Sequence, residues 1–137
     1  MTFGSTRGRP HYLYYMRLFA YPNKPNKDDY MASPHIDELN LLHAHVCSAL
    51  GDPTRLQILY ALNDEPQRVS VLADALDIPQ STISRHLAVL HQRSLVTKER
   101  NGMAVVYTLA DSRIIDVLDT MRQVLRDALD RQSNMLS

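Results

Sequence analysis

The stretch "DIPQSTISRHLAVLHQRSLV" (residues 77–96) constrains the fold most, because it places a tight break directly before a short amphipathic helix. The proline in residues 77–79 cannot continue a helix from upstream. Apolar side chains then recur at helical spacing, at Ile83, Leu87 and Leu90. Short polar side chains and one arginine occupy the opposite face and its flanks, at Ser81, Thr82, Ser84 and Arg85. We therefore expect a helix over about residues 80–93 that buries one face and exposes a polar, short-chained end.

The surrounding sequence predicts further helices and one hairpin. The predicted elements are helices over residues 36–50, 52–63 and 69–76, a hairpin over residues 95–109, and a final helix from Asp111 to residue 131. Asp52-Pro53 supplies a capping acid and a proline at the first helical position of the second helix. Asn101-Gly102 joins two β-prone runs and is a preferred pair for a type I′ hairpin turn. The final helix carries a broad apolar stripe that extends to Leu129.

Two helices about three residues apart, followed by a β-hairpin, form a winged helix-turn-helix. The predicted fold is therefore mainly α with a small β-hairpin. A chain of 137 residues suits one domain, and 45% apolar residues suffice for a core. We divide it into an N-terminal extension (residues 1–35), the winged helix-turn-helix (residues 36–131) and a C-terminal tail (residues 132–137).

The polar end of the helix and the hairpin tip predict contact with DNA. In such folds the first turns of the recognition helix enter the major groove, so short side chains allow close approach. Arg85 is suited to pair with guanine. The hydroxyls and the free backbone N–H groups are suited to bind phosphates. We expect His86 to pack against the protein or to face a phosphate. The candidate DNA-binding residues are Gln80, Ser81, Thr82, Ser84, Arg85, His86, Lys98, Arg100 and Asn101.

Other interpretations of these two elements remain open. A polar outward face with serines is typical of any surface helix, and a basic hairpin tip also protects an exposed sheet edge. A winged helix can instead contact proteins, but that function would favour an apolar outward face. Although the net charge is zero, residues 80–101 contain four basic and one acidic side chain. The two elements in tandem therefore favour DNA binding.

Several function classes are not supported by the sequence. No apolar run approaches the roughly 20 residues that cross a bilayer, and a single cysteine, Cys47, indicates the cytoplasm. The sequence shows no nucleophile motif, phosphate-binding glycine loop, or paired carboxylates with a matching histidine, so we expect no enzyme.

Two segments carry a specific resemblance to a known family. "ALGDPTRLQILYAL" and "LADALDIPQSTISRHLAVLHQRSLVTKERNGMAVVYTL" resemble the ArsR/SmtB family of bacterial transcriptional repressors. The resemblance covers about residues 39–130. It implies a homodimer formed through the first and last helices that binds a palindromic double-stranded DNA operator. The effector and the operator sequence stay unknown.

The resemblance also implies metal sensing, but the usual ligands are missing. Where the family has a Cys-x-Cys pair in the third helix, this chain has Arg68 and Ser70, and neither binds a soft metal. The family's other site uses Asp and His on the final helix, which contains no histidine here. We therefore expect no metal cofactor.

A less favoured alternative is a redox or metal site on the first predicted helix. His43 and Cys47 are four residues apart and share a helical face, with His45 between them. Packing against apolar neighbours accounts for the same pattern. Cys47 would form a covalent dimer on oxidation if it lay near the two-fold axis.

The N-terminal extension allows three interpretations. Five basic residues among tyrosines would suit an arm that lies along DNA. A disordered tail, or a start at Met31 rather than Met1, is the alternative that we favour.

Overall fold

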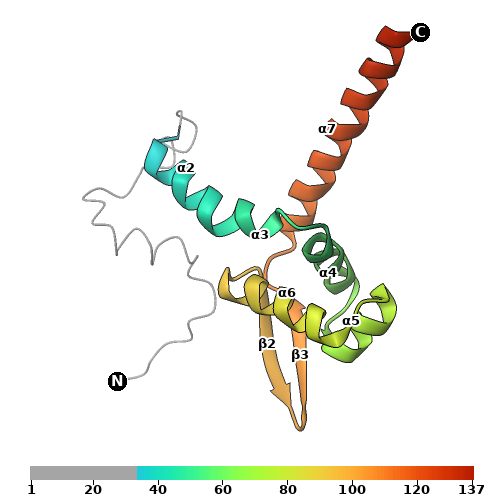
Figure 1. Ribbon diagram of the computed structural model, residues 1–137. Helices are drawn as coiled ribbons and strands as arrows, with labels where there is room; N and C mark the ends of the chain where they lie inside the picture. Colours follow the sequence, from blue (N-terminus) through green and yellow to red (C-terminus); the bar gives the residue numbers. More distant parts are fainter. Residues whose placement is uncertain (1–33) are drawn as a thin grey trace. The chain divides into compact units, whose positions relative to one another are not determined.

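The computed structural model describes residues 34–137 (Figure 1). The chain divides into two units, residues 1–40 and residues 41–137. The predicted N-terminal extension ends at residue 35, so it lies almost entirely outside the described residues. The second unit contains the elements that the sequence predicts for a winged helix-turn-helix.

The helices and strands follow the predicted order. They are α2 (Ile36–Leu42), a π-helical segment η2 (His43–Cys47), α3 (Ser48–Leu50), α4 (Pro53–Asp64), β1 (Gln67–Arg68), α5 (Val69–Leu76), α6 (Gln80–Gln92), β2 (Val96–Asn101), β3 (Ala104–Leu109) and α7 (Arg113–Leu136). The limits of α4, α5, α6 and the hairpin agree with prediction to within one residue. The π-helical turn inside the first predicted helix was not expected.

The core of residues 41–137 lies where α4, α5, α6 and α7 meet the hairpin. Its buried members are Ile58, Leu59, Leu62, Leu72, Ala73, Ile83, Leu87, Leu90, Val96, Ile115 and Leu118. The three apolar positions that defined the amphipathic α6 helix are all fully buried. The periodicity of residues 77–96 thus correctly predicts which face of α6 packs inward.

Each helix of the helix-turn-helix is followed by a residue in the left-handed conformation. Asp77 follows α5 with φ 53°, and the Ile78 N–H donates to Ala73 O at 3.0 Å. Ser94 follows α6 with φ 60°, and the Leu95 N–H donates to Leu90 O at 2.9 Å. This bond spacing is that of a Schellman motif, which satisfies the last helical carbonyls and reverses the chain. The break after α5 is therefore set by Asp77 as well as by the proline.

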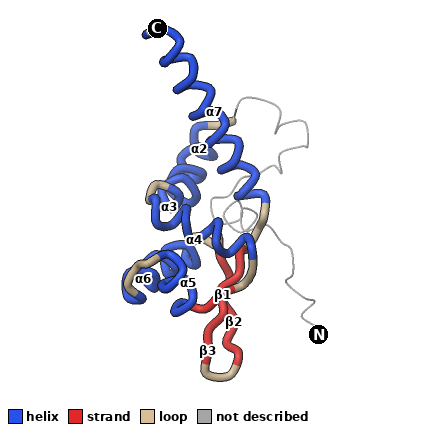
Figure 2. The backbone as a smooth tube through the Cα atoms, turned by 90° about the vertical axis from the view of Figure 1, so that its right-hand side faces the viewer, coloured by secondary structure: helices blue, strands red, loops and turns tan. Residues whose placement is uncertain are grey.

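The sheet has three strands rather than the two of the predicted hairpin. Its order is β1-β3-β2, and β1 pairs antiparallel with β3 through Gln67 and Tyr107. In Figure 2 the three strands lie together at one end of this unit, and α7 leads away at the other. Two residues are too short for an alternating pattern, so β1 gave no sequence signal.

The predicted hairpin turn is wrong by one residue. Asn101 pairs with Ala104, so the two loop residues are Gly102 and Met103 rather than Asn101-Gly102. Gly102 has φ 65°, and Met103 has no positive φ. Positive φ at the first loop position alone is the pattern of a type II′ turn, which places glycine there. Asn101 instead ends strand β2.

Helix α7 is longer than predicted. It runs through Leu136, so the expected tail at residues 132–137 is helical up to that residue. The capping position is Ser112, which makes no side-chain cap bond, and the predicted capping residue Asp111 lies one residue earlier, where its carboxylate accepts the backbone N–H of Arg113 at 2.9 Å. Most of its apolar stripe remains exposed, at Val117, Met121, Val124, Leu125 and Leu129.

Candidate nucleic-acid interface

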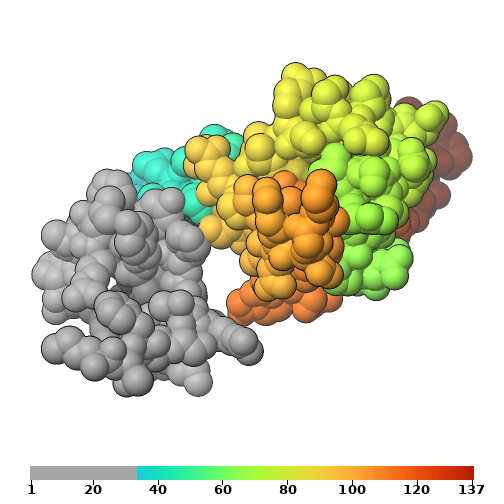
Figure 3. Space-filling model, turned by 90° about the horizontal axis from the view of Figure 1, so that it is seen from below, coloured from blue at the N-terminus to red at the C-terminus, as the bar shows by residue number. Residues whose placement is uncertain are grey.

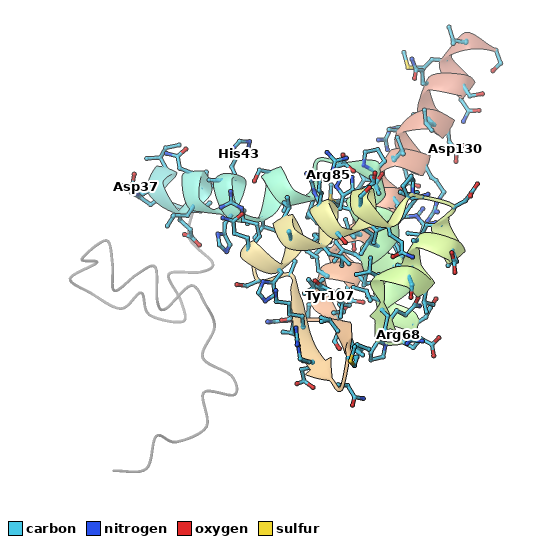
Figure 4. The ribbon with its side chains drawn as sticks, turned by 60° about the horizontal axis from the view of Figure 1, so that its bottom comes forward. Asp37, His43, Arg68, Arg85, Tyr107 and Asp130 are labelled. Carbon is cyan, nitrogen blue, oxygen red and sulfur yellow. The ribbon has the colours of Figure 1, made fainter. Side chains whose placement is uncertain are left out.

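The outward face of α6 is polar and accessible. Gln80, Ser81, Ser84 and Arg85 are exposed, and Thr82 is half-buried. The buried apolar face of the helix fixes this orientation, because Ser81, Ser84 and Arg85 lie one or two positions from a buried residue and so point to another side of the helix. Figure 4 labels Arg85 on this helix. The structure thus brings five of the predicted DNA-binding residues together in the first turns of one helix.

The start of α6 leaves backbone donors open. Pro79 precedes the helix, and no side chain caps this end. The Thr82 N–H already bonds Pro79 O at 3.0 Å, so the unpaired amides are those of the residues before it. Free N–H groups and the positive end of the helix dipole favour an anion here.

The hairpin lies beside α6 on the same face of the molecule. Figure 3 shows the orange hairpin residues flanked by the yellow residues of α6. Lys98 and Arg100 alternate with Glu99 along β2, so the two cations share one face of the strand. Lys98 pairs with Tyr107 and Arg100 with Val105. All side chains of β2 after Val96 are exposed, including Asn101, so the positive charge of this strand is available to a partner.

His86 is held from inside the protein. Its side chain is only 18% exposed, and Nδ1 lies 3.4 Å from Arg55 Nη1 and 3.9 Å from Asp52 Oδ1. The structure places His86 against Arg55 and Asp52, and its contact with phosphate stays a prediction. Arg55 was not singled out from the sequence, although it stands in the "DPTR" segment that carries the resemblance.

Asp52 organises the start of α4. Its Oδ1 accepts the backbone N–H groups of Thr54 at 2.8 Å and Arg55 at 3.2 Å. Burial raises the pKa of Asp52, but these two backbone hydrogen bonds, together with the positive charge of Arg55, outweigh it, so the pKa is lowered. The carboxylate therefore stays charged at neutral pH.

The alternative site on the first helix has a different geometry from the one expected. His43 and Cys47 are the first and last residues of the π-helical segment, and both are exposed. Packing in the interior of this chain therefore does not explain them. Among residues 34–137, no group of three or more His, Cys, Asp or Glu side chains is placed to hold a metal ion. The same residues contain no helix that could span a membrane.

Comparison with known proteins agrees with this geometry. The family model "Bacterial regulatory protein, arsR family" matches residues 52–98, from the cap of α4 to the hairpin. KmtR, an HTH-type transcriptional regulator of Mycobacterium tuberculosis, is 32% identical over 70% of this chain and 68% of its own length. The chain belongs to the arsR family of bacterial regulatory proteins.

Two further relatives show how far the likeness of this arsR-family chain extends. SmtB of Mycobacterium tuberculosis, an HTH-type transcriptional repressor, is 39% identical over 59% of this chain, but the match spans only 61% of SmtB. A solved structure, the homodimeric winged helix-turn-helix domain of Mb0332 from Mycobacterium bovis, is 27% identical with a TM-score of 0.60. That match covers 73% of this chain and 94% of the Mb0332 chain, which confirms the winged helix-turn-helix fold.

Proposed function

We propose that this protein is a sequence-specific DNA-binding transcriptional regulator that acts as a repressor. The observation that carries the proposal is the exposed polar start of α6, fixed in place by a fully buried apolar face and flanked by the basic strand β2. Arg85 is suited to read guanine, and the hydroxyls and open amides are suited to hold phosphates. The named regulators and repressor among its relatives support the same function.

We further propose that the protein acts as a homodimer on a palindromic operator. The stripe on α7 exposes large side chains that proteins in water rarely leave uncovered: Val117 is 49% exposed, Met121 58% and Val124 60%. Leu42, the last residue of α2 in the middle of the first predicted helix, is 48% exposed as well. A two-fold pair formed through these helices would set two α6 helices about 34 Å apart, the spacing of successive major grooves. The homodimeric Mb0332 domain supports this arrangement.

Selection of bound fragments from random duplex DNA tests the regulator. We expect one enriched, palindromic sequence whose affinity falls steeply as salt is raised, because phosphate contacts release counterions. Enrichment of no sequence would contradict the proposal. Repeating the selection with metals, chelator and peroxide tests the predicted alternative that His43, His45 and Cys47 respond to an effector.

Light scattering in solution tests the homodimer. Leu125→Glu places a charge in the exposed apolar stripe of α7, and we expect it to shift the mass from dimer to monomer. Thr120→Glu adds the same charge to α7 at a polar exposed position, so it is the matched control and should remain dimeric. A wild-type protein that is monomeric at micromolar concentration would rule out the interface.

A further inference from the structure

We propose that Arg55 is a positioning residue for DNA binding, which ties the recognition helix α6 to the end of α3. The inference rests on the proposed function, and it assigns to Arg55 a role that requires no contact with DNA. Its guanidinium joins three places at once: two backbone carbonyls that precede α4, and His86 on α6.

The bonds to the backbone fix the guanidinium itself. Arg55 Nε donates to Ala49 O, and Nη2 donates to Ser48 O at 3.1 Å. These carbonyls belong to the last turn of the first helix, where no later helical N–H reaches them because the helix ends at Leu50. A positive charge at a helix C-terminus is also favoured by the helix dipole. The side chain is half-buried, and these two hydrogen bonds restrain its guanidinium.

The remaining guanidinium nitrogen of Arg55 contacts α6. Arg55 Nη1 lies 3.4 Å from His86 Nδ1. Arginine has no acceptor atom, so the contact is a hydrogen bond only when Nδ1 carries no proton. The contact joins the flank of α6 to the same guanidinium that the two carbonyls hold.

The position of His86 on α6 makes this contact matter for recognition. It follows Arg85 directly, and Leu87 comes next in the fully buried face. The core sets which face of α6 turns inward, and a polar contact on its flank adds a second restraint on the rotation of the helix and on its shift along its axis. Recognition depends on such placement, because a displacement of about 1 Å carries a side-chain donor out of hydrogen-bonding range of its base.

Three donors in one plane are a property of arginine alone. A lysine ammonium is a single point at the end of a flexible stem, so it would reach one of these acceptors but not hold all three. Arg55→Lys therefore keeps the charge and removes the bridge. Among variants of Arg55, it is the one best suited to separate positioning from charge.

The test compares operator binding with binding to an unrelated duplex, by fluorescence anisotropy, for the full-length protein. The operator is the sequence selected by the wild type. We expect Arg55→Lys and Arg55→Ala each to weaken operator binding about tenfold, the range of a hydrogen bond to a charged group. Binding to the unrelated duplex should change less than about threefold, because the phosphate contacts remain. Arg131→Ala removes one exposed positive charge from α7 and serves as the control.

A double-mutant cycle with His86→Ala identifies the route of the effect. If Arg55 acts through His86, the double variant Arg55→Ala/His86→Ala should bind the operator no more weakly than the weaker single variant. Additive effects of the two substitutions would overturn the proposal. So would an Arg55→Lys protein that binds the operator like the wild type, and this variant answers the question even if Arg55→Ala does not fold. A wild type that binds no duplex would overturn both the proposed function and this inference, whereas unchanged variants of a DNA-binding wild type would overturn this inference alone.

Discussion

The phenol of Tyr60 donates a hydrogen bond to Asp119 Oδ1 at 2.6 Å, and this bond joins α4 to α7. Arg122 completes the cluster: its Nη1 lies 3.1 Å from the same oxygen, and its guanidinium lies 5.4 Å from the centre of the Tyr60 ring. The cluster follows Leu118, the last buried side chain of α7. It therefore marks the point beyond which α7 leaves the core.

Tyr60→Phe should loosen α7 and change the titration of Asp119. The hydrogen bond from Tyr60 is the largest cause that lowers the pKa of Asp119, ahead of the bond from Arg122. We expect the pKa of Asp119 to rise toward its ordinary value in Tyr60→Phe, and to rise less in Arg122→Gln. Carboxyl ¹³C NMR during a pH titration measures both shifts. An Asp119 carboxyl that titrates as in the wild type would show that the bond does not persist in solution.

Asp77→Gly should stabilise the fold by about 1 kcal/mol, because residues with a Cβ are strained in the left-handed conformation that Asp77 adopts. Urea unfolding monitored by circular dichroism measures the change in the free energy of unfolding. Asp74→Gly makes the same substitution three residues earlier, inside α5, where glycine weakens a helix. Opposite signs for the two variants are expected; a decrease in both would contradict the assigned conformation.

Acid should remove a stabilising contribution from Asp111. Bonds from the side chain and the backbone N–H of Arg113 lower the pKa of Asp111 from 3.8 to about 2. A group whose folded pKa is depressed stabilises the fold above the unfolded value and loses that effect as pH falls from about 4 to about 2. Asp111→Asn should therefore be less stable than the wild type at neutral pH, with a difference that narrows below about pH 4.

Salt provides the check on this Asp111 prediction. The Arg113 side chain is 84% exposed and that of Asp111 48%, so solvent screens the pair and the effect is small. About 1 M salt should reduce the part of the stability difference between the wild type and Asp111→Asn that comes from charge, as measured by unfolding. A difference that is constant from acid to neutral pH would mean that the ion pair contributes nothing.

Arg85→Ala and Lys98→Ala should affect DNA binding in different ways, the first through sequence preference and the second through overall affinity. Arg85→Ala should cost about 1–3 kcal/mol of operator binding and relax the preference at one base position. Lys98→Ala should weaken binding to all sequences alike and reduce the slope of log affinity against log salt by about one. Competition binding with operator variants and a salt titration distinguish the two. If Arg85→Ala selected the same operator as the wild type, Arg85 would not read a base.

How much of the candidate interface the sequence predicts depends on how local the signal is. The burial of Leu87 and the exposure of Arg85 follow from helical periodicity, which uses neighbours within two turns. The contact between Arg55 and His86 joins residues 31 positions apart, and no periodic pattern records it. The pairing of β1 with β3 is missed for the same reason, since a two-residue strand exists only through its partner.

The sequence by itself determined the order and type of α4, α5, α6, the two hairpin strands and α7, because helix spacing, caps and turn residues act over a few neighbouring positions. Only the tertiary structure decided which polar groups meet, that Asn101 pairs rather than turns, and that the stripe on α7 finds no cover within the described residues. These outcomes depend on three-dimensional packing, in which distant segments compete for the same buried surface and hydrogen-bond partners.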